Sequence, residues 1–195
     1  MLQKYFHEKF GSLDILFDSH CHLTWFPDDK LQGIIDDSIK AGVKKIIDIA
    51  VDLDSSKKTL ENSQKFPGVV FPTAGIDPEI VIPGSELFIK DLTLDRIEEL
   101  LEELQRFVSE NHKDLIMVGE CGLDYYWIHK SDLSDLEIQT SIDFQKIIFA
   151  RQIQLAERYS LPLSIHHRES LDDCLTLMKG KKVNAIFHSF TGDTN

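Results

Sequence analysis

The chain has 195 residues, of which 42% are hydrophobic and 28% are charged. These fractions are typical of a folded globular domain and exclude a disordered or collagen-like chain. The formal net charge of −12 argues against a protein that wraps nucleic acid with a broad basic face. It does not exclude an enzyme that grips a few phosphates through bound cations.

The sequence also indicates a compartment. No apolar run approaches the roughly 20 residues of a membrane span, and the first residues mix charges with aromatic side chains, unlike a signal peptide. The cysteines are few and odd in number, and none forms a CxxC pair: Cys21, Cys121 and Cys174. We therefore expect a cytoplasmic protein with reduced thiols, without a thiolate zinc site and without a membrane segment.

Strand-like and helix-like stretches alternate along the chain. Strands are expected at 14–18, 43–51, 69–76, 115–119, 162–165 and 183–187. Helices are expected at about 31–42, 54–66, 93–111, 136–159 and 171–180. Asp54 and Ser55 are expected to cap the second helix, and Gly42 to end the first.

Strict alternation of this kind predicts an α/β fold with parallel strands and outer helices. The two candidates are a doubly wound sheet and a (β/α)8 TIM-type barrel. An eight-strand barrel takes about 250 residues, so we expect this chain to hold about six of the eight strands. Residues 1–14 are expected to be an N-terminal extension, and residues 15–195 an incomplete barrel domain.

The first candidate site is the segment Asp18-Ser19-His20-Cys21-His22. Two histidines two positions apart in an extended chain face the same way and can bind one divalent metal. Cys21 then faces the opposite side and serves packing. The alternative is a polar loop with two solvated histidines.

Three further segments contain residues that could bind a metal ion or a phosphate. Glu120 follows an apolar strand, where burial of a carboxylate costs free energy unless the group is paired or bound to metal. The alternative is that Glu120 lies in a loop and is solvated by water. His166 ends another strand, and Arg168 offers a bidentate fork for a phosphate unless it pairs with Glu169. His167 is expected to face away. His188 ends the last strand, and its alternative role is that of a hydrogen-bonded structural residue.

These residues all lie at the carboxyl ends of predicted strands, which favours one common site over unrelated structural roles. In a barrel the carboxyl ends of all strands form one face, where active sites lie. Four histidines and one carboxylate form a nitrogen–oxygen ligand set that suits Zn, Mn, Ni or Mg. The set is His20, His22, Glu120, His166 and His188. A carboxylate can bridge two ions, an arrangement that activates water.

Four motifs resemble the TatD family of metal-dependent deoxyribonucleases, in the family order: DSHCHL, GECGLDYY, PLSIHHRES and FHSFTG. The resemblance runs from about Ile15 to the end of the chain. It implies a TIM barrel, two divalent metal ions, DNA as the partner, and hydrolysis of phosphodiester esters, often as a 3′ exonuclease. By motif match, His20 and His22 would bind one metal, Glu120 would bridge both, and His166 and His188 would complete the second site.

The sequence departs from the family pattern in two places. The family often has a GxHP segment, and here Asp77 stands at the histidine position, where a substrate or phosphate contact is expected. The family's later aspartate motif is missing, so the chain resembles a C-terminally truncated member. The alternatives are a small-molecule amidohydrolase or other ester hydrolase on the same barrel, and an inactive truncated fragment. Glu120 stands where many amidohydrolases need a lysine, which favours the nuclease.

Overall fold

The computed structural model describes residues 16–190. Its six strands form one sheet in the order β1-β2-β3-β4-β5-β6, and every neighbouring pair is parallel. The strands are β1 (Leu16–Cys21), β2 (Val43–Asp48), β3 (Val70–Ala74), β4 (Met117–Asp124), β5 (Leu163–Arg168) and β6 (Ala185–Phe187). A doubly wound sheet reverses its strand order at a switch point. The order here never reverses, which identifies the barrel type of α/β fold.

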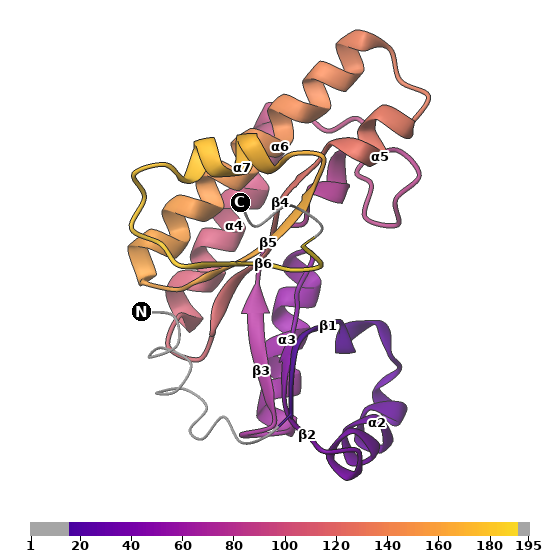
Figure 1. Ribbon diagram of the computed structural model, residues 1–195, viewed down its shortest axis with the longest axis vertical. Helices are drawn as coiled ribbons and strands as arrows, with labels where there is room; N and C mark the ends of the chain where they lie inside the picture. The colour runs from indigo at the N-terminus through magenta and orange to yellow at the C-terminus, as the bar shows by residue number, and fades with distance from the viewer. Residues whose placement is uncertain (1–15, 191–195) are drawn as a thin grey trace.

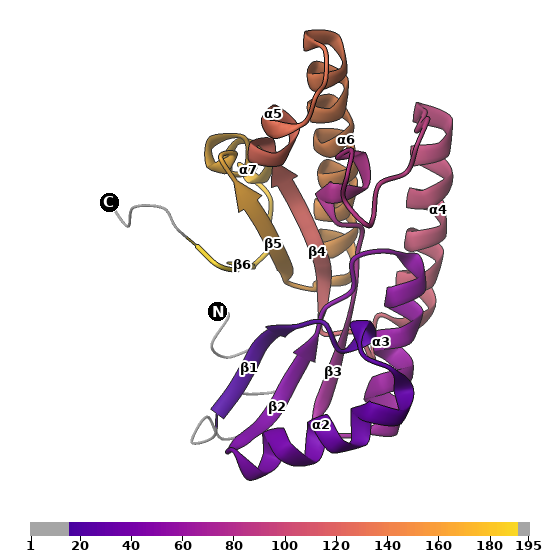
Figure 2. The same ribbon diagram turned by 90° about the vertical axis from the view of Figure 1, so that its right-hand side faces the viewer.

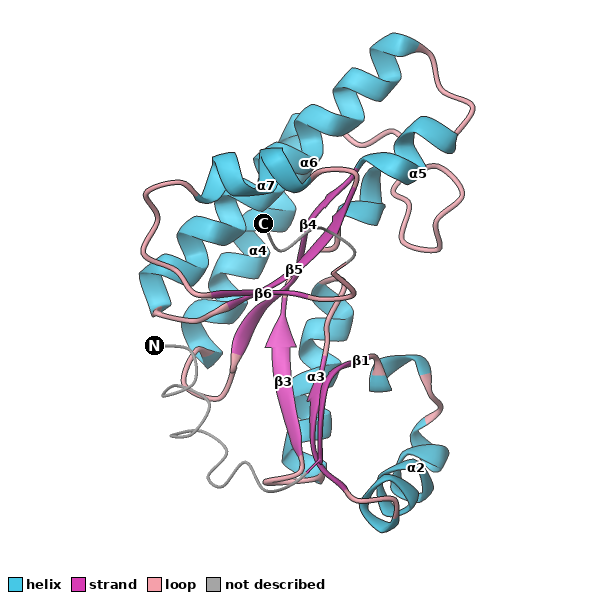
Figure 3. Cartoon of the chain, viewed as in Figure 1, coloured by secondary structure: helices cyan, strands magenta, loops and turns pink. Residues whose placement is uncertain are grey.

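Helices connect the strands. They are α2 (Asp28–Lys40), α3 (Leu53–Lys65), α4 (Leu94–Asn111), α5 (Tyr125–Lys130), α6 (Asp135–Tyr159) and α7 (Leu171–Met178), with 3-10 turns η1 (Leu23–Trp25) and η2 (Pro78–Val81). Figures 1 and 3 show them along the outside of the strands, and Figure 2 shows the sheet curling into part of a barrel. No helix within residues 16–190 is long and apolar enough to cross a membrane.

The core lies mainly between the sheet and its helices. In α4 the residues at helical spacing Ile97, Leu101, Leu104 and Val108 are buried, as the sequence predicts, whereas Leu94 is exposed. A smaller cluster that includes Ile47, Ile49 and Met117 is separate from this layer. Ile46 belongs to the buried cluster around Leu31 and Ile47 to this one, so neighbouring positions of β2 are buried on opposite faces of the sheet.

Most expected elements are confirmed, with two corrections. The cap of α3 is Asp52, whose carboxylate accepts from the Ser55 backbone N–H at 2.7 Å, so Asp54 is not the cap. The fourth strand does not end at Gly119 but continues to Asp124. Gly119 and Gly122 have φ values of +148° and +139° and pack against the backbone of β5, which a Cβ would prevent. Strand pairing therefore continues past Glu120. The expected extension at 1–14 lies outside the described residues.

Candidate metal centre

Glu120 lies at the centre of the candidate site. It projects from the middle of β4 and is only 3% exposed, so it is not the loop acid that the sequence left as an alternative. Thr73 holds the preceding carbonyl, that of Gly119, with a hydrogen bond of 2.7 Å. The Glu120 backbone N–H donates to Ala50 O at 2.6 Å. Contacts from two neighbouring segments thus fix the backbone that carries the carboxylate.

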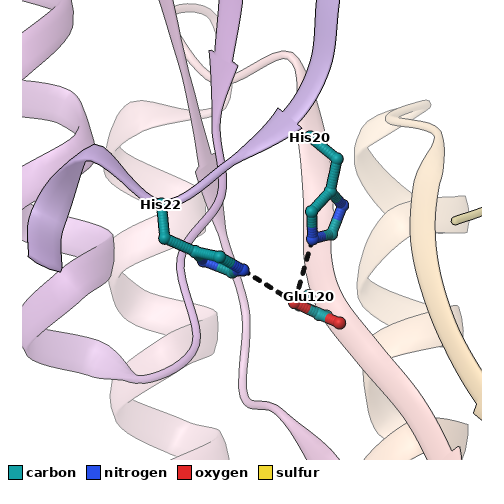
Figure 4. Close-up of side chains that lie close together, drawn as sticks. All are labelled: His20, His22 and Glu120. Atoms are coloured by element: carbon teal, nitrogen blue, oxygen red, sulfur yellow. Dashed lines mark ion pairs between the residues drawn. The ribbon is translucent and has the colours of Figure 1, made fainter. Parts of the chain in front are cut away.

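Each oxygen of the Glu120 carboxylate faces two imidazoles. Oε2 lies 3.3 Å from His20 Nε2 and 3.6 Å from His22 Nε2 (Figure 4). Oε1 lies 3.1 Å from His166 Nδ1 and 2.6 Å from His188 Nε2. The five side chains therefore form two groups of three possible ligands that share Glu120. All five residues that the sequence placed in one cluster do converge.

The geometry of these groups fits metal ions. Two nitrogens bound to one tetrahedral zinc ion at 2.0–2.1 Å lie about 3.3 Å apart. His188 Nε2 and His166 Nδ1 are 3.3 Å apart, and both face the same oxygen of Glu120. His20 is stacked on His188 at 4.0 Å between centroids, which brings the two groups together. The ligand set contains no thiolate: Cys21 packs with the core cluster around Leu31.

A second carboxylate orients His166. Asp124, fully buried at the end of β4, lies 2.9 Å from His166 Nε2, so the ring stands between two carboxylates. Burial lowers the pKa of His166, but its hydrogen bonds to Asp124 and Glu120 outweigh burial and raise this pKa to about 10. Burial raises the pKa of Glu120, and the surrounding histidines overcome this effect and lower it. With Asp124 on Nε2, the Nδ1 atom faces the shared carboxylate.

The loop after β1 is held by buried polar contacts. His22 Nδ1 lies 3.0 Å from Ile49 O, which leaves Nε2 directed at Glu120. Burial of the ring lowers the pKa of His22, which favours the neutral imidazole that a metal requires. Asp48, fully buried in β2, accepts from Leu23 N at 2.8 Å and from Asn62 Nδ2 at 2.8 Å. Asp48 therefore fixes the residue directly after His22.

The remaining candidate residues are placed as follows. Arg168 is exposed and makes no ion pair with Glu169 among residues 16–190. His167 packs its ring against Phe187 and Phe190, away from Glu120, as expected. Asp77 is 4% exposed and caps η2 by accepting from Glu79 N at 2.7 Å. Burial, then the nearby charge of Glu120, raises the pKa of Asp77. Its contact with a substrate stays a prediction.

Sequence reasoning missed Asp48 and Trp25, and it named Asp124 only as a possible replacement for the missing aspartate, not as the partner of His166. Asp124 and Asp48 carry a recognisable signal, because each is an acid inside or directly after an otherwise apolar run, where it needs a partner. Trp25 stacks on His22 at 4.2 Å between ring centroids and is 69% exposed. Its position three residues after His22 was the only signal for it.

Fold and cluster together define an α/β-barrel protein with a candidate metal centre made of two ligand groups that share Glu120. The sequence profile of the family described as TatD related DNase matches residues 17–195. The chain therefore belongs to the TatD related DNase family.

Individual relatives agree with this assignment. The chain is 28% identical over 182 residues to the uncharacterized metal-dependent hydrolase YabD of Bacillus subtilis, covering 91% of this chain and 62% of the relative. It is 28% identical over 180 residues to deoxyribonuclease TATDN3 of Homo sapiens, and the match covers 91% of this chain and 61% of the relative. The crystal structure of YJJV, a TatD homolog from Escherichia coli, superimposes on this chain with a TM-score of 0.70 at 24% sequence identity. The superposition covers 91% of this chain and 61% of that structure, and it supports the fold. The chain thus spans about three fifths of these relatives.

Proposed function

We propose that this chain is part of a metal-dependent hydrolase that cleaves DNA phosphodiester bonds, acting as a 3′ exonuclease on a centre of two divalent ions. The observation that supports it is the shared carboxylate: Glu120 presents one oxygen to His20 and His22 and the other to His166 and His188. The chain's relatives include a deoxyribonuclease by name.

Each residue has a role in this proposal. His20 and His22 would hold one ion, His166 and His188 would hold the other, and Glu120 would contribute to both. When bound, such ions lower the pKa of a coordinated water and clamp the phosphoryl oxygens. Asp124 keeps His166 in the orientation that directs Nδ1 to the centre.

Arg168 supplies the phosphate contact. It follows His166 by two positions on β5, so both side chains leave the same face of the strand. Its guanidinium offers five N–H donors in a planar fork that matches a phosphate. A net charge of −12 excludes broad phosphate neutralisation, so the proposal relies on this local contact and on bound cations.

The test is digestion of single-stranded DNA labelled at either the 5′ or the 3′ end, with the metal-stripped protein supplied with Mg, Mn, Zn or Ni in turn. It is run on the chain and on an extended form as long as its relatives. We expect release of mononucleotides from the 3′ end that stops on chelation. Metal-independent cleavage, or none by the extended form with any metal, would reject the proposal.

A further inference from the structure

A cluster of aromatic and cationic side chains lies beside the candidate metal centre. The Arg168 guanidinium carbon stands 4.1 Å from the centroid of the Tyr126 ring and 5.2 Å from that of Trp127. The two rings meet edge to face, with centroids 5.0 Å apart. The register of β4 against β5 explains the contact, because Asp124, which precedes α5, pairs with Arg168. The side chain of Arg168 is therefore held in place by aromatic faces.

The hydrogen-bonding edge of the Arg168 guanidinium has no partner in the part of the chain that the structure describes. Within residues 16–190 its N–H groups have no ion-pair or hydrogen-bond partner, and the side chain is exposed. Stacking on a ring occupies the face of a guanidinium and leaves its edge donors available. An arginine that is positioned but unpaired is suited to an anion that arrives from solution.

The side chain of Trp127 is not part of the hydrophobic core. It is 44% exposed, whereas its neighbours Tyr125 and Ile128 bury the inner side of α5. The indole lines a cleft of about 470 Å³ together with Pro83, Gly84 and Lys130. An exposed aromatic face beside cations, in a cleft of this volume, is the arrangement on which unpaired bases stack.

The carboxylate of Asp124 contacts both the aromatic cluster and the candidate metal centre. Asp124 contacts His166 Nε2 through Oδ2 and accepts from the Trp127 backbone N–H through Oδ1 at 2.9 Å. Arg168 lies two residues beyond His166 on β5, which is about 7 Å along a strand. A ligand held by Arg168 and Trp127 therefore adjoins whatever is bound at the metal centre.

We propose that Trp127, Tyr126 and Arg168 form a nucleotide subsite in which Trp127 stacks on an unpaired base and Arg168 binds the adjoining phosphate. The proposal rests on the proposed function and deepens it, because it specifies a single-stranded end as the substrate. A base inside a duplex is stacked on its neighbours and cannot present its face to the indole. Lys130, whose ammonium lies 5.7 Å from the Tyr126 centroid, lines the same cleft as Trp127, together with one acid, Glu79.

The test is fluorescence titration in the presence of chelator, where no hydrolysis takes place. Trp25→Phe leaves Trp127 as the only tryptophan of the chain. We expect a pentamer of thymidylate to quench this fluorescence, and an abasic pentamer with the same phosphates, or a blunt duplex, to leave it unchanged. Equal quenching by the abasic pentamer would overturn the stacking role.

Variants separate the two contacts. Trp127→Ala should weaken binding of the thymidylate pentamer roughly 5- to 150-fold, the range of one base–aromatic stack, and leave binding of the abasic pentamer unchanged. Trp127→Phe keeps a ring and should retain most of the affinity. Arg168→Ala should weaken both ligands. The matched control is Arg158→Ala, because Arg158 is also exposed and lies 5.6 Å from the Tyr159 ring, but at the far end of α6.

The outcomes separate this proposal from the proposed function. Base-dependent quenching with no cleavage in any metal would retain the subsite and reject the nuclease. Cleavage of single-stranded DNA with unchanged affinity in a folded Trp127→Ala variant would retain the nuclease and reject the subsite.

Discussion

The Glu120 carboxylate lies against four imidazoles, two on each oxygen. Glu120→Gln keeps the shape of the side chain but removes the charge and one of the two equivalent acceptor oxygens. We expect it to lower the metal content measured by elemental analysis and to reduce the rate of DNA cleavage by the extended form about a thousandfold or more. Asp77→Asn is the comparison, since Asp77 caps η2 and should affect both readouts much less. Equal effects of the two substitutions would show that Glu120 does not bridge.

Asp124 offers a separate test of how His166 is oriented. Asp124→Asn keeps the volume but can present an N–H instead of an acceptor to His166 Nε2, which shifts the ring's tautomer. We expect metal affinity, measured by titration calorimetry, to fall about 10- to 100-fold, as for other residues that orient metal-binding histidines. The ¹⁵N chemical shifts of His166 should move as well. The control is Asp173→Asn, whose carboxylate accepts from Tyr125 OH at 2.7 Å and contacts no histidine. Unchanged shifts of His166 would contradict this role of Asp124.

Asp48 should make stability depend on pH. Burial raises its pKa from 3.8 to about 6, against the hydrogen bonds of Asn62 and Leu23 that lower it. Because the pKa is higher in the folded state, the protonated carboxyl of Asp48 contributes to the free energy of unfolding. This contribution is fully present below pH 3.8 and is lost as the pH rises through about 6. Asp48→Asn removes this titration, and its new amide can donate to Asn62 Oδ1, a buried atom without a partner among the described residues.

We therefore expect the parent to lose about 2 kcal/mol of unfolding free energy relative to Asp48→Asn between pH 4 and pH 7. Urea unfolding of both proteins at several pH values measures the difference. A constant difference between the two proteins across this range would show that Asp48 does not titrate.

Strand β4 depends on glycine where it passes the site. A Cβ on Gly122 would overlap the carbonyl oxygen of His166, and the residue has a φ of +139°. Gly122→Ala should therefore separate β4 from β5 at the level of the metal centre and destabilise the fold by several kcal/mol. The control is Gly33→Ala in α2, where a Cβ meets nothing within 4 Å and should stabilise the helix by about 0.5–1 kcal/mol. Thermal unfolding of the two variants should shift in opposite directions, and a stable Gly122→Ala would refute the packing argument.

The elements that the sequence predicts well are those with strong periodicity. The buried stripe of α4 and the alternation of strands with helices follow from apolar spacing alone, and the convergence of His20, Glu120 and His188 follows from the barrel's single catalytic face. The short helix α5 was missed because six residues, including three aromatics, carry no helical period. The path of β4 beyond Gly119 was missed because it depends on close packing against β5, which no local pattern encodes.

At the scale of the whole molecule, β1 and β6 each have one neighbour in the sheet formed by the described residues. Unpaired strand edges favour association with other chains. Leu16 stands on β1 and is 61% exposed. We expect the 195-residue chain to elute as oligomers in size-exclusion chromatography as its concentration rises, and Leu16→Lys to shift it toward the monomer. Leu136→Lys, at a 77% exposed position on α6, is the control that should leave the elution unchanged. A parent chain that stays monomeric would contradict the argument.

The strictly sequential strand order also has a consequence for synthesis of the protein. His20 lies in β1 and His22 directly after it, Glu120 lies in β4, and His188 lies directly after β6. At about 5–20 residues per second a ribosome needs on the order of 10–40 s for a chain of 195 residues. During most of that time the nascent chain carries the first pair of histidines without Glu120 or without its second pair. The ligand cluster is complete in sequence only when the segment directly after β6 has been translated, so that nucleic acid near the ribosome meets no assembled centre before that point.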